Sequence, residues 1–168
     1  STNVSFTYTA AQYSSDKTIT VTATADSSNV ITESNEGNNA RSASFRVLAL
    51  PDLTISSLSG NKPLYEAGET VTVSAVVRNI GQSASPASTV RLTVPSIGTF
   101  SQNVAALNAD GIQTVTFNFT APTSLSPQSI LITAFVDPNN LIVEINENNN
   151  SRTAVISVNA LRPDANQD

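Results

Sequence analysis

The chain has 168 residues with no His, Cys, Met or Trp, and its 13 acidic and 8 basic side chains give a formal net charge of −5. Without His or Cys, Ser-His and Cys-His nucleophile pairs are excluded, and zinc, haem and iron–sulfur sites are not expected. The acidic balance argues against nucleic acid and anionic membrane surfaces as partners. The remaining options are carboxylate chemistry, oxygen-ligated cations and binding without catalysis.

The surface composition is typical of exported proteins. Only 12% of the residues are charged, about half of the roughly 25% in average soluble domains, so Ser, Thr and Asn must supply the polar surface. No apolar run approaches the roughly 18 residues of a membrane-spanning helix, so membrane insertion is not expected. We therefore expect an extracellular or cell-surface location.

Apolar residues recur at every second position along most of the chain, for example over residues 4–8 and 115–119. This period of two predicts antiparallel strands with one buried and one solvated face, and it predicts that Phe6, Phe117 and Phe119 pack in a core. Gly and Pro separate these segments, and helix is expected to be negligible. The predicted strands lie near 3–10, 18–25, 41–47, 52–58, 70–79, 88–95, 100–107, 112–120, 129–136 and 152–159.

The strand count predicts an all-β fold. The seven strands predicted after residue 50 occupy about 110 residues, the size of one immunoglobulin-like antiparallel β-sandwich. The three strands in the first 49 residues are predicted to be the last three of another such unit. The expected architecture is one complete seven-strand sandwich preceded by the last three strands of another.

This organisation rests on an internal repeat. Residues 3–50 align without a gap with residues 114–161 at a constant offset of 111, and about twenty positions are identical. A repeat of about 110 residues is one β-sandwich long. We interpret residues 1–49 as the C-terminal part of one repeat, 50–160 as a complete repeat, and 161–168 as the start of a further repeat or a disordered tail. Neighbouring repeats of a longer parent chain are therefore the expected partners.

The incomplete first repeat needs a cover. Three strands alone would leave unpaired edges and an exposed apolar face. We therefore expect residues 1–49 either to pack on the complete unit or to self-associate with a second copy of the chain.

The strongest candidate for chemistry is an acidic, Asn-rich segment that occurs in both repeats and holds six of the 13 acidic residues. Ca²⁺ takes six to eight oxygen ligands from carboxylates, amides and backbone carbonyls, and this segment supplies all three, so Ca²⁺ is the one candidate cofactor. An immunoglobulin-like strand order places the segment near the start of the first strand, so Asp52 and the turn 79–81 are expected nearby. The candidate metal ligands are Asp137, Glu144, Asn146 and Glu147, with Asp26, Glu33, Asn35 and Glu36 in the first repeat.

A structural role for these residues is the alternative. Asn and Asp form Asx-turns and cap exposed backbone groups, so a long hairpin connection can use them as scaffolding. Glu144 would then anchor the loop by accepting backbone N–H bonds. A glycosidase pair, for instance Glu144 with Glu147, is disfavoured because the chain has no Trp or His to shape a sugar subsite. No catalytic residue is assigned, and no enzyme activity is expected.

Five short motifs occur in order in the complete unit, and the last of them recurs within residues 26–39. They are Pro-Asp-Leu at 51–53, Gly-Glu-Thr-Val-Thr-Val at 68–73, Val-Arg-Asn-Ile-Gly at 77–81, Asp-Pro at 137–138 and Glu-Ile-Asn-Glu-Asn-Asn-Asn at 144–150. In this ordered set the chain resembles CARDB, the cell-adhesion-related domain of bacterial and archaeal surface proteins. The resemblance implies immunoglobulin-like sandwiches, usually in tandem, in exported proteins where they serve as spacers, adhesive modules or appendages to enzymes.

The leading hypothesis is a non-catalytic cell-surface or secreted β-sandwich repeat that acts as a spacer or adhesion module of a larger exported protein. The connection over residues 47–52 would limit the angles between repeats, because Pro51 fixes its own φ and restricts Leu50. Two alternatives stay open. One is a substrate- or carbohydrate-targeting accessory module of a secreted hydrolase, and the other is a Ca²⁺-dependent adhesin repeat.

Overall fold

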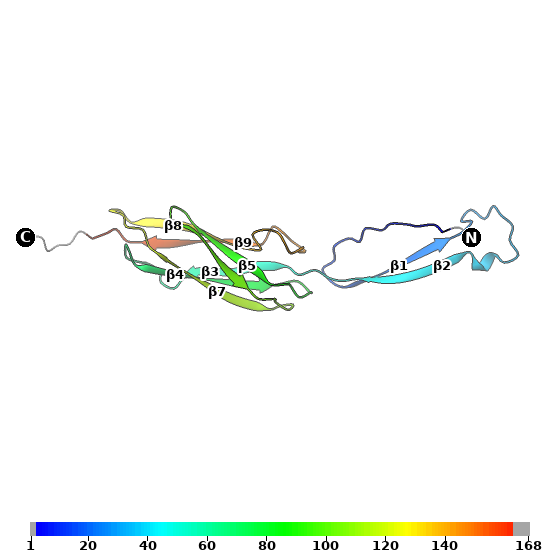
Figure 1. The fold of residues 1–168 in the computed structure, drawn as a ribbon, viewed down its shortest axis with the longest axis horizontal. Helices are drawn as coiled ribbons and strands as arrows, with labels where there is room; N and C mark the ends of the chain where they lie inside the picture. The colour runs from blue at the N-terminus through cyan, green and yellow to red at the C-terminus, as the bar shows by residue number, and fades with distance from the viewer. Residues whose placement is uncertain (1–2, 163–168) are drawn as a thin grey trace, which may run out of the picture. The chain divides into compact units, whose positions relative to one another are not determined.

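The computed structural model describes residues 3–162, so most of the segment 161–168 lies outside the described residues. Contacts divide the chain into two compact units, Ser1–Ala49 and Leu50–Asp168, which we call the N-terminal unit and the complete unit. Both units are built from antiparallel strands (Figure 1). Within the described residues, no helix is long and apolar enough to cross a membrane.

The complete unit is a sandwich of two antiparallel sheets, which confirms the predicted fold class. One sheet has the strand order β3-β4-β7 and the other has the order β6-β5-β8-β9. The strands are β3 (Leu53–Gly60), β4 (Thr70–Asn79), β5 (Ser88–Val94), β6 (Gly98–Val104), β7 (Ile112–Thr120), β8 (Gln128–Val136) and β9 (Ser151–Val158). Each corresponds to a predicted strand. The largest shift is at β6, which begins and ends earlier than expected because a short turn after Val94 leads directly into Gly98.

The core of the complete unit lies between its two sheets. Alternate residues of β4 are fully buried, among them Val71, Val73 and Val77, and they pack with Leu92 of β5 and Ile132 of β8 in one apolar cluster. Burying each such side chain stabilises the fold by about 1.5–3 kcal/mol. The period of two in the sequence thus places the core residues correctly in this unit.

Tyr65 joins the two sheets at the opposite end from the β8–β9 connection. Its backbone N–H donates to Ser157 and its carbonyl accepts from Asn159, so the β3–β4 loop extends the sheet that contains β9. Its ring is buried and its hydroxyl donates to Asn61 Oδ1 over 2.7 Å. A buried tyrosine of this kind contributes apolar contact while its polar end stays hydrogen-bonded.

The N-terminal unit contains a two-stranded hairpin that repeats β8 and β9. Its strands are β1 (Lys17–Thr24) and β2 (Ala40–Val47), with one turn of 3₁₀ helix, η1 (Glu36–Asn38), between them. The pair Lys17↔Val47 corresponds, at the offset of 111 residues, to Gln128↔Val158, so the register of the two hairpins is the same. The repeated sequence therefore folds into the same hairpin twice.

The strand predicted near residues 3–10 does not form, and this part of the prediction is wrong. These residues correspond to β7, which in the complete unit pairs with β4 along its whole length. The described part of the N-terminal unit has no equivalent of β4, so residues 3–10 have no ladder to join. The predicted burial of Phe6 fails for the same reason: its side chain is 85% exposed, whereas the equivalent Phe117 is 2% exposed.

Candidate functional site

The site predicted from the sequence is the connection between β8 and β9, residues 137–150, which we call the acidic loop. It begins with a tight turn at Asp137, whose φ of 48° lies in the left-handed region that Asp and Asn tolerate best among non-glycine residues. Asp137 accepts the N–H of Asn140 at its backbone carbonyl and that of Ile142 at Oδ2, over 3.0 and 2.8 Å. The Asp137 carboxylate is buried and shapes the loop's own backbone.

Glu147 and Asn146 hold the second half of the acidic loop. Glu147 Oε1 accepts the N–H of Glu144 over 2.8 Å, and Asn146 Oδ1 accepts the N–H of Asn148 over 3.1 Å. These are short-range side-chain-to-backbone bonds of the kind that stabilise turns. Two more of the candidate metal ligands therefore have one oxygen each committed to the loop.

Glu144 is fully buried and fastens the loop to the start of the first strand. Its Oε2 accepts the N–H of Leu53 over 2.7 Å, and its Oε1 accepts from the side-chain amide of Asn150 over 3.2 Å. Burial raises the pKa of the Glu144 carboxyl from 4.5 to about 7, and the negative charges of Glu147 and Asp137 add to the rise, while the two hydrogen bonds oppose it. Glu144 thus links the two ends of the unit's sequence.

Further bonds tie the same strand start to the loop and to Asn79. Asn149 Nδ2 donates to Asp52 Oδ1 over 2.8 Å, and the N–H of Ile145 donates to the carbonyl of Pro51 over 3.0 Å. Asp52 therefore lies beside the acidic loop, as predicted, and it connects the loop to the turn after β4 through its bonds with Asn79 and Ile80. We call the set Asp52, Asn79, Glu144, Asn149 and Asn150 the joint network.

Asn79 connects Asp52 of this network to the turn after β4, and its role was only partly visible in the sequence. Its side chain is completely buried and accepts the N–H groups of Asp52 and Gly81 at Oδ1, over 3.0 and 3.1 Å. Its amide donates to the carbonyls of Ser83 and Leu107, over 2.7 and 3.1 Å. The single signal in the sequence is an amide at a position where the period of two predicts a core residue.

The N-terminal copy of the loop, residues 26–39, has the same internal bonds. Asp26 Oδ2 accepts from Ile31 and Glu36 Oε1 accepts from Glu33, both over 2.8 Å, and Asn35 Oδ1 accepts from Gly37 over 3.0 Å. Each bond has its counterpart 111 residues later in the acidic loop. The difference is Glu33, which is exposed where Glu144 is buried.

The fit of these residues to a metal ion is limited. Nowhere in residues 3–162 do three or more acidic side chains come together in a group that could hold a metal. In the acidic loop, the buried oxygens without a hydrogen-bond partner are Glu147 Oε2, Asn149 Oδ1 and Asn150 Oδ1. Three oxygens are fewer than the six to eight that Ca²⁺ takes, so water would have to complete the shell.

The chain matches one family model over two segments, residues 1–43 and 50–154, and that family is CARDB. The chain belongs to the CARDB family. CARDB is an adhesion-related domain of cell-surface proteins, and the matched residues include both acidic segments and all but the last four residues of each hairpin. The comparison with curated protein sequences gives no match.

Two solved structures support the CARDB fold. The crystal structure of a CARDB domain from Pyrococcus furiosus, in complex with di-metal ions, is 28% identical, with a TM-score of 0.58 over 67% of this chain and 96% of that one. A domain from Methanosarcina acetivorans, provisionally described as part of a cell surface protein, is 33% identical, with a TM-score of 0.53 over 68% of this chain and 95% of that one.

Proposed function

We propose that this CARDB chain is a non-catalytic spacer or adhesion module of a larger exported protein, with a mechanical role. The observation that carries the proposal is the joint network, which fastens the start of the complete unit's first strand. Pro51 and Asp52 are buried, and hydrogen bonds from or to Ile145, Asn79 and Asn149 hold them. Because the start of β3 is hydrogen-bonded on several sides, a force that pulls on it is transmitted to the core of the sandwich and does not peel β3 away from the sheet.

The residue before this connection is fastened too. Ala49 is buried, and its N–H donates to Asp16 Oδ1 over 2.7 Å. This bond, followed by the ion pair with Arg46, holds the pKa of Asp16 below its usual range. Only Leu50 stands between Ala49 and Pro51, and Pro51 restricts its conformation. A short connection with fixed ends suits a spacer better than it suits a flexible tether.

The backbone dynamics of residues 49–54 in the full chain test this proposal. We expect amide order parameters near 0.85, as in rigid backbone, for the residues in this segment that carry an N–H. Glu144→Ala should lower them by removing the acceptor of the Leu53 N–H, and Glu33→Ala, the matched change in the N-terminal copy, should not. Order parameters below about 0.6 in the unaltered chain would contradict a spacer with a stiff connection.

Retention on polysaccharides separates the spacer from a carbohydrate-targeting module. If the chain is a spacer, we expect it to pass without delay through columns packed with insoluble polysaccharides or carrying immobilised soluble glycans. Saturable binding with a dissociation constant in the micromolar range would favour the targeting module instead.

Ca²⁺ binding by the acidic loop is a second candidate. Two observations favour it: the three buried oxygens without partners, and the di-metal ions in the related Pyrococcus furiosus domain. Glu147, Asn149 and Asn150 would hold the ion, and the ion would stiffen the loop by neutralising the carboxylates near it. The test is the melting temperature after chelator treatment and again in millimolar Ca²⁺. A rise that Glu147→Gln abolishes supports the candidate, and an unchanged melting temperature refutes it.

A further inference from the structure

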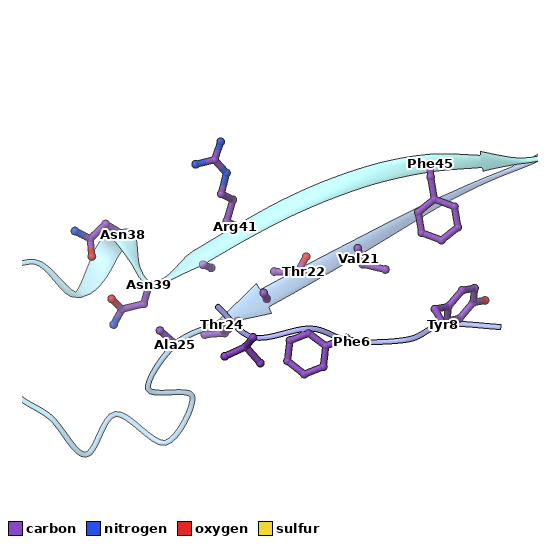
Figure 2. A pocket seen from close by; sticks show the side chains of 13 residues that line it. Phe6, Tyr8, Val21, Thr22, Thr24, Ala25, Asn38, Asn39, Arg41 and Phe45 are labelled. Carbon is purple, nitrogen blue, oxygen red and sulfur yellow. The ribbon is translucent and has the colours of Figure 1, made fainter. Parts of the chain in front are cut away.

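The N-terminal unit carries an exposed apolar surface. Phe6 and Tyr8 from the extended segment and Phe45 from β2 point into one hollow of about 700 Å³, and the rings of Tyr8 and Phe45 lie 5.9 Å apart (Figure 2). Large exposed apolar surfaces of this kind mark interaction sites. We call the following residues the apolar face: Val4, Phe6, Tyr8, Val21, Ala23 and Phe45.

Every residue of the apolar face has a buried counterpart in the complete unit. At the offset of 111 residues the counterparts are Val115, Phe117, Phe119, Ile132, Ala134 and Ile156. All of them belong to the core cluster, where they pack against β3, β4 and β5. The apolar face is therefore the inner surface of a sandwich of which the N-terminal unit holds one part.

The apolar residue at the tip of the loop is equally exposed in the two units. Val30 is a large apolar residue in the N-terminal copy of the loop and is 79% exposed, and its counterpart Leu141 is 81% exposed. The hairpin itself is not looser, because the register of β1 with β2 and the hydrogen bonds inside the loop are the same as in the complete unit. The difference at Phe6 and Phe117 therefore reports a missing neighbour.

Two backbone edges point to the same neighbour. Residues 3–10 correspond to β7, which pairs with β4, and β1 corresponds to β8, which pairs with β5. In the described residues of the N-terminal unit, β1 pairs only with β2, and neither residues 3–10 nor the other edge of β1 has a partner strand. The exposed Glu33 corresponds to Glu144, which accepts the N–H of Leu53 at the start of β3. The missing contacts therefore belong to β3, β4 and β5 together.

We infer that the apolar face is a docking surface for the first four strands of a CARDB unit, a segment equivalent to residues 50–113 of this chain. The docked segment would pair one strand with residues 3–10 and another with β1, and its first strand would donate an N–H to Glu33. This inference rests on the repeat and on burial, and it does not depend on the spacer role of the complete unit.

The test is a chain in which residues 50–113 are joined directly in front of residue 3, with residues 3–168 otherwise unchanged. The junction reproduces the spacing between residues 113 and 114 of the complete unit. We expect the amides of residues 4–10 and of β1 to gain at least about 1,000-fold protection from hydrogen exchange, the lower end of folding equilibrium constants for small domains. The amides of the complete unit serve as an internal reference.

A pair of truncations identifies the surface. In the joined chain, Phe6→Ala should reduce the gained protection by about 100-fold or more, as expected for removal of a buried Phe side chain. Val30→Ala should change it by no more than about threefold, because the counterpart of Val30 is exposed in a complete sandwich. Equal effects of the two truncations, or no gain of protection on joining, would overturn the inference.

The unaltered chain provides the remaining outcomes. We expect it to be a monomer by light scattering, with rapid exchange in residues 4–10. Dimerisation that Phe6→Ala abolishes would show that a second copy covers the apolar face and would overturn the inference. Protection in a monomer would show that the complete unit of the same chain covers it, with the same consequence.

Discussion

The titration of Glu144 is the most direct test of the joint network. Its carboxyl is buried, and its pKa is raised from 4.5 to about 7, mainly by burial. Between these pH values the folded chain therefore binds the proton more tightly than the unfolded chain does. The free energy of unfolding contributed by this group is largest below pH 4.5 and falls as the pH rises to about 7.

The size of the effect follows from the pKa change. A rise from 4.5 to about 7 corresponds to about 3 kcal/mol at most. The acidic loop borders solvent at Asn146 and Asn148, so screening reduces the expected loss to about 1–2 kcal/mol. Asp16 and Glu69 contribute a pH dependence of opposite sign at low pH. Hydrogen bonds from Ala49 and Arg46 lower the pKa of Asp16, and those from Lys62 and Glu66 lower the pKa of Glu69.

Glu144→Gln isolates the contribution. The Gln carbonyl can still accept the Leu53 N–H, and the Oδ1 of Asn150, which has no partner, can accept from the new amide after the Asn150 side chain flips. We expect the stability of the wild type relative to E144Q to fall by about 1–2 kcal/mol between pH 4.5 and 8.

Urea denaturation at closely spaced pH values measures this difference. Far-UV circular dichroism follows the strands, and Tyr65, the one tyrosine of the complete unit, reports its core by fluorescence. Glu33→Gln is the matched control, since Glu33 is exposed and should give the wild-type profile. A difference between wild type and E144Q that does not change with pH would refute the reasoning.

Three further changes test the packing. Asn79→Ala should destabilise the complete unit by about 2–4 kcal/mol in urea denaturation, because it leaves several buried backbone groups without partners. Gly81→Ala should cost about 1–3 kcal/mol, since a Cβ there would lie 2.6 Å from the backbone of Pro51 and Asp52. Phe117→Ala should cost about 3–5 kcal/mol, whereas Phe6→Ala in the unaltered chain should leave the melting temperature of the complete unit unchanged.

The strands of the complete unit could be predicted because apolar and polar residues alternate along a strand that has one buried face. The same period at residues 4–8 gave a wrong prediction of a strand. Val4 and Phe6 match Val115 and Phe117 residue for residue, but a strand also needs a partner to receive its hydrogen bonds. Pairing is a non-local property, and no local pattern reports whether the partner is present.

The residue types of the acidic loop were enough to locate the candidate site in the sequence. They were not enough to predict where its side chains point. The acidic and Asn-rich spacing marks the loop, and Ca²⁺ ligation and scaffolding both use those residue types. Only the structure shows that Glu144 turns inward to Leu53, which lies 91 positions earlier in the sequence. The contact that decides the role of this residue is therefore the one furthest from it along the chain.

A comparison of the two copies of the loop shows which of its features depend only on nearby residues and which depend on the first strand of the unit. Asp26 and Asp137 accept the corresponding N–H over the same 2.8 Å, although only the second loop has a first strand beside it. The shape of the loop and the register of its hairpin therefore need only the residues of the hairpin itself. Burial of the Glu carboxylate needs the first strand, because the Leu53 N–H is what offsets part of its desolvation. In the complete unit of this chain, the hairpin thus supplies the acceptor, Glu144, and the start of the first strand supplies the donor, the Leu53 N–H, and this bond fastens the two parts of the sandwich together.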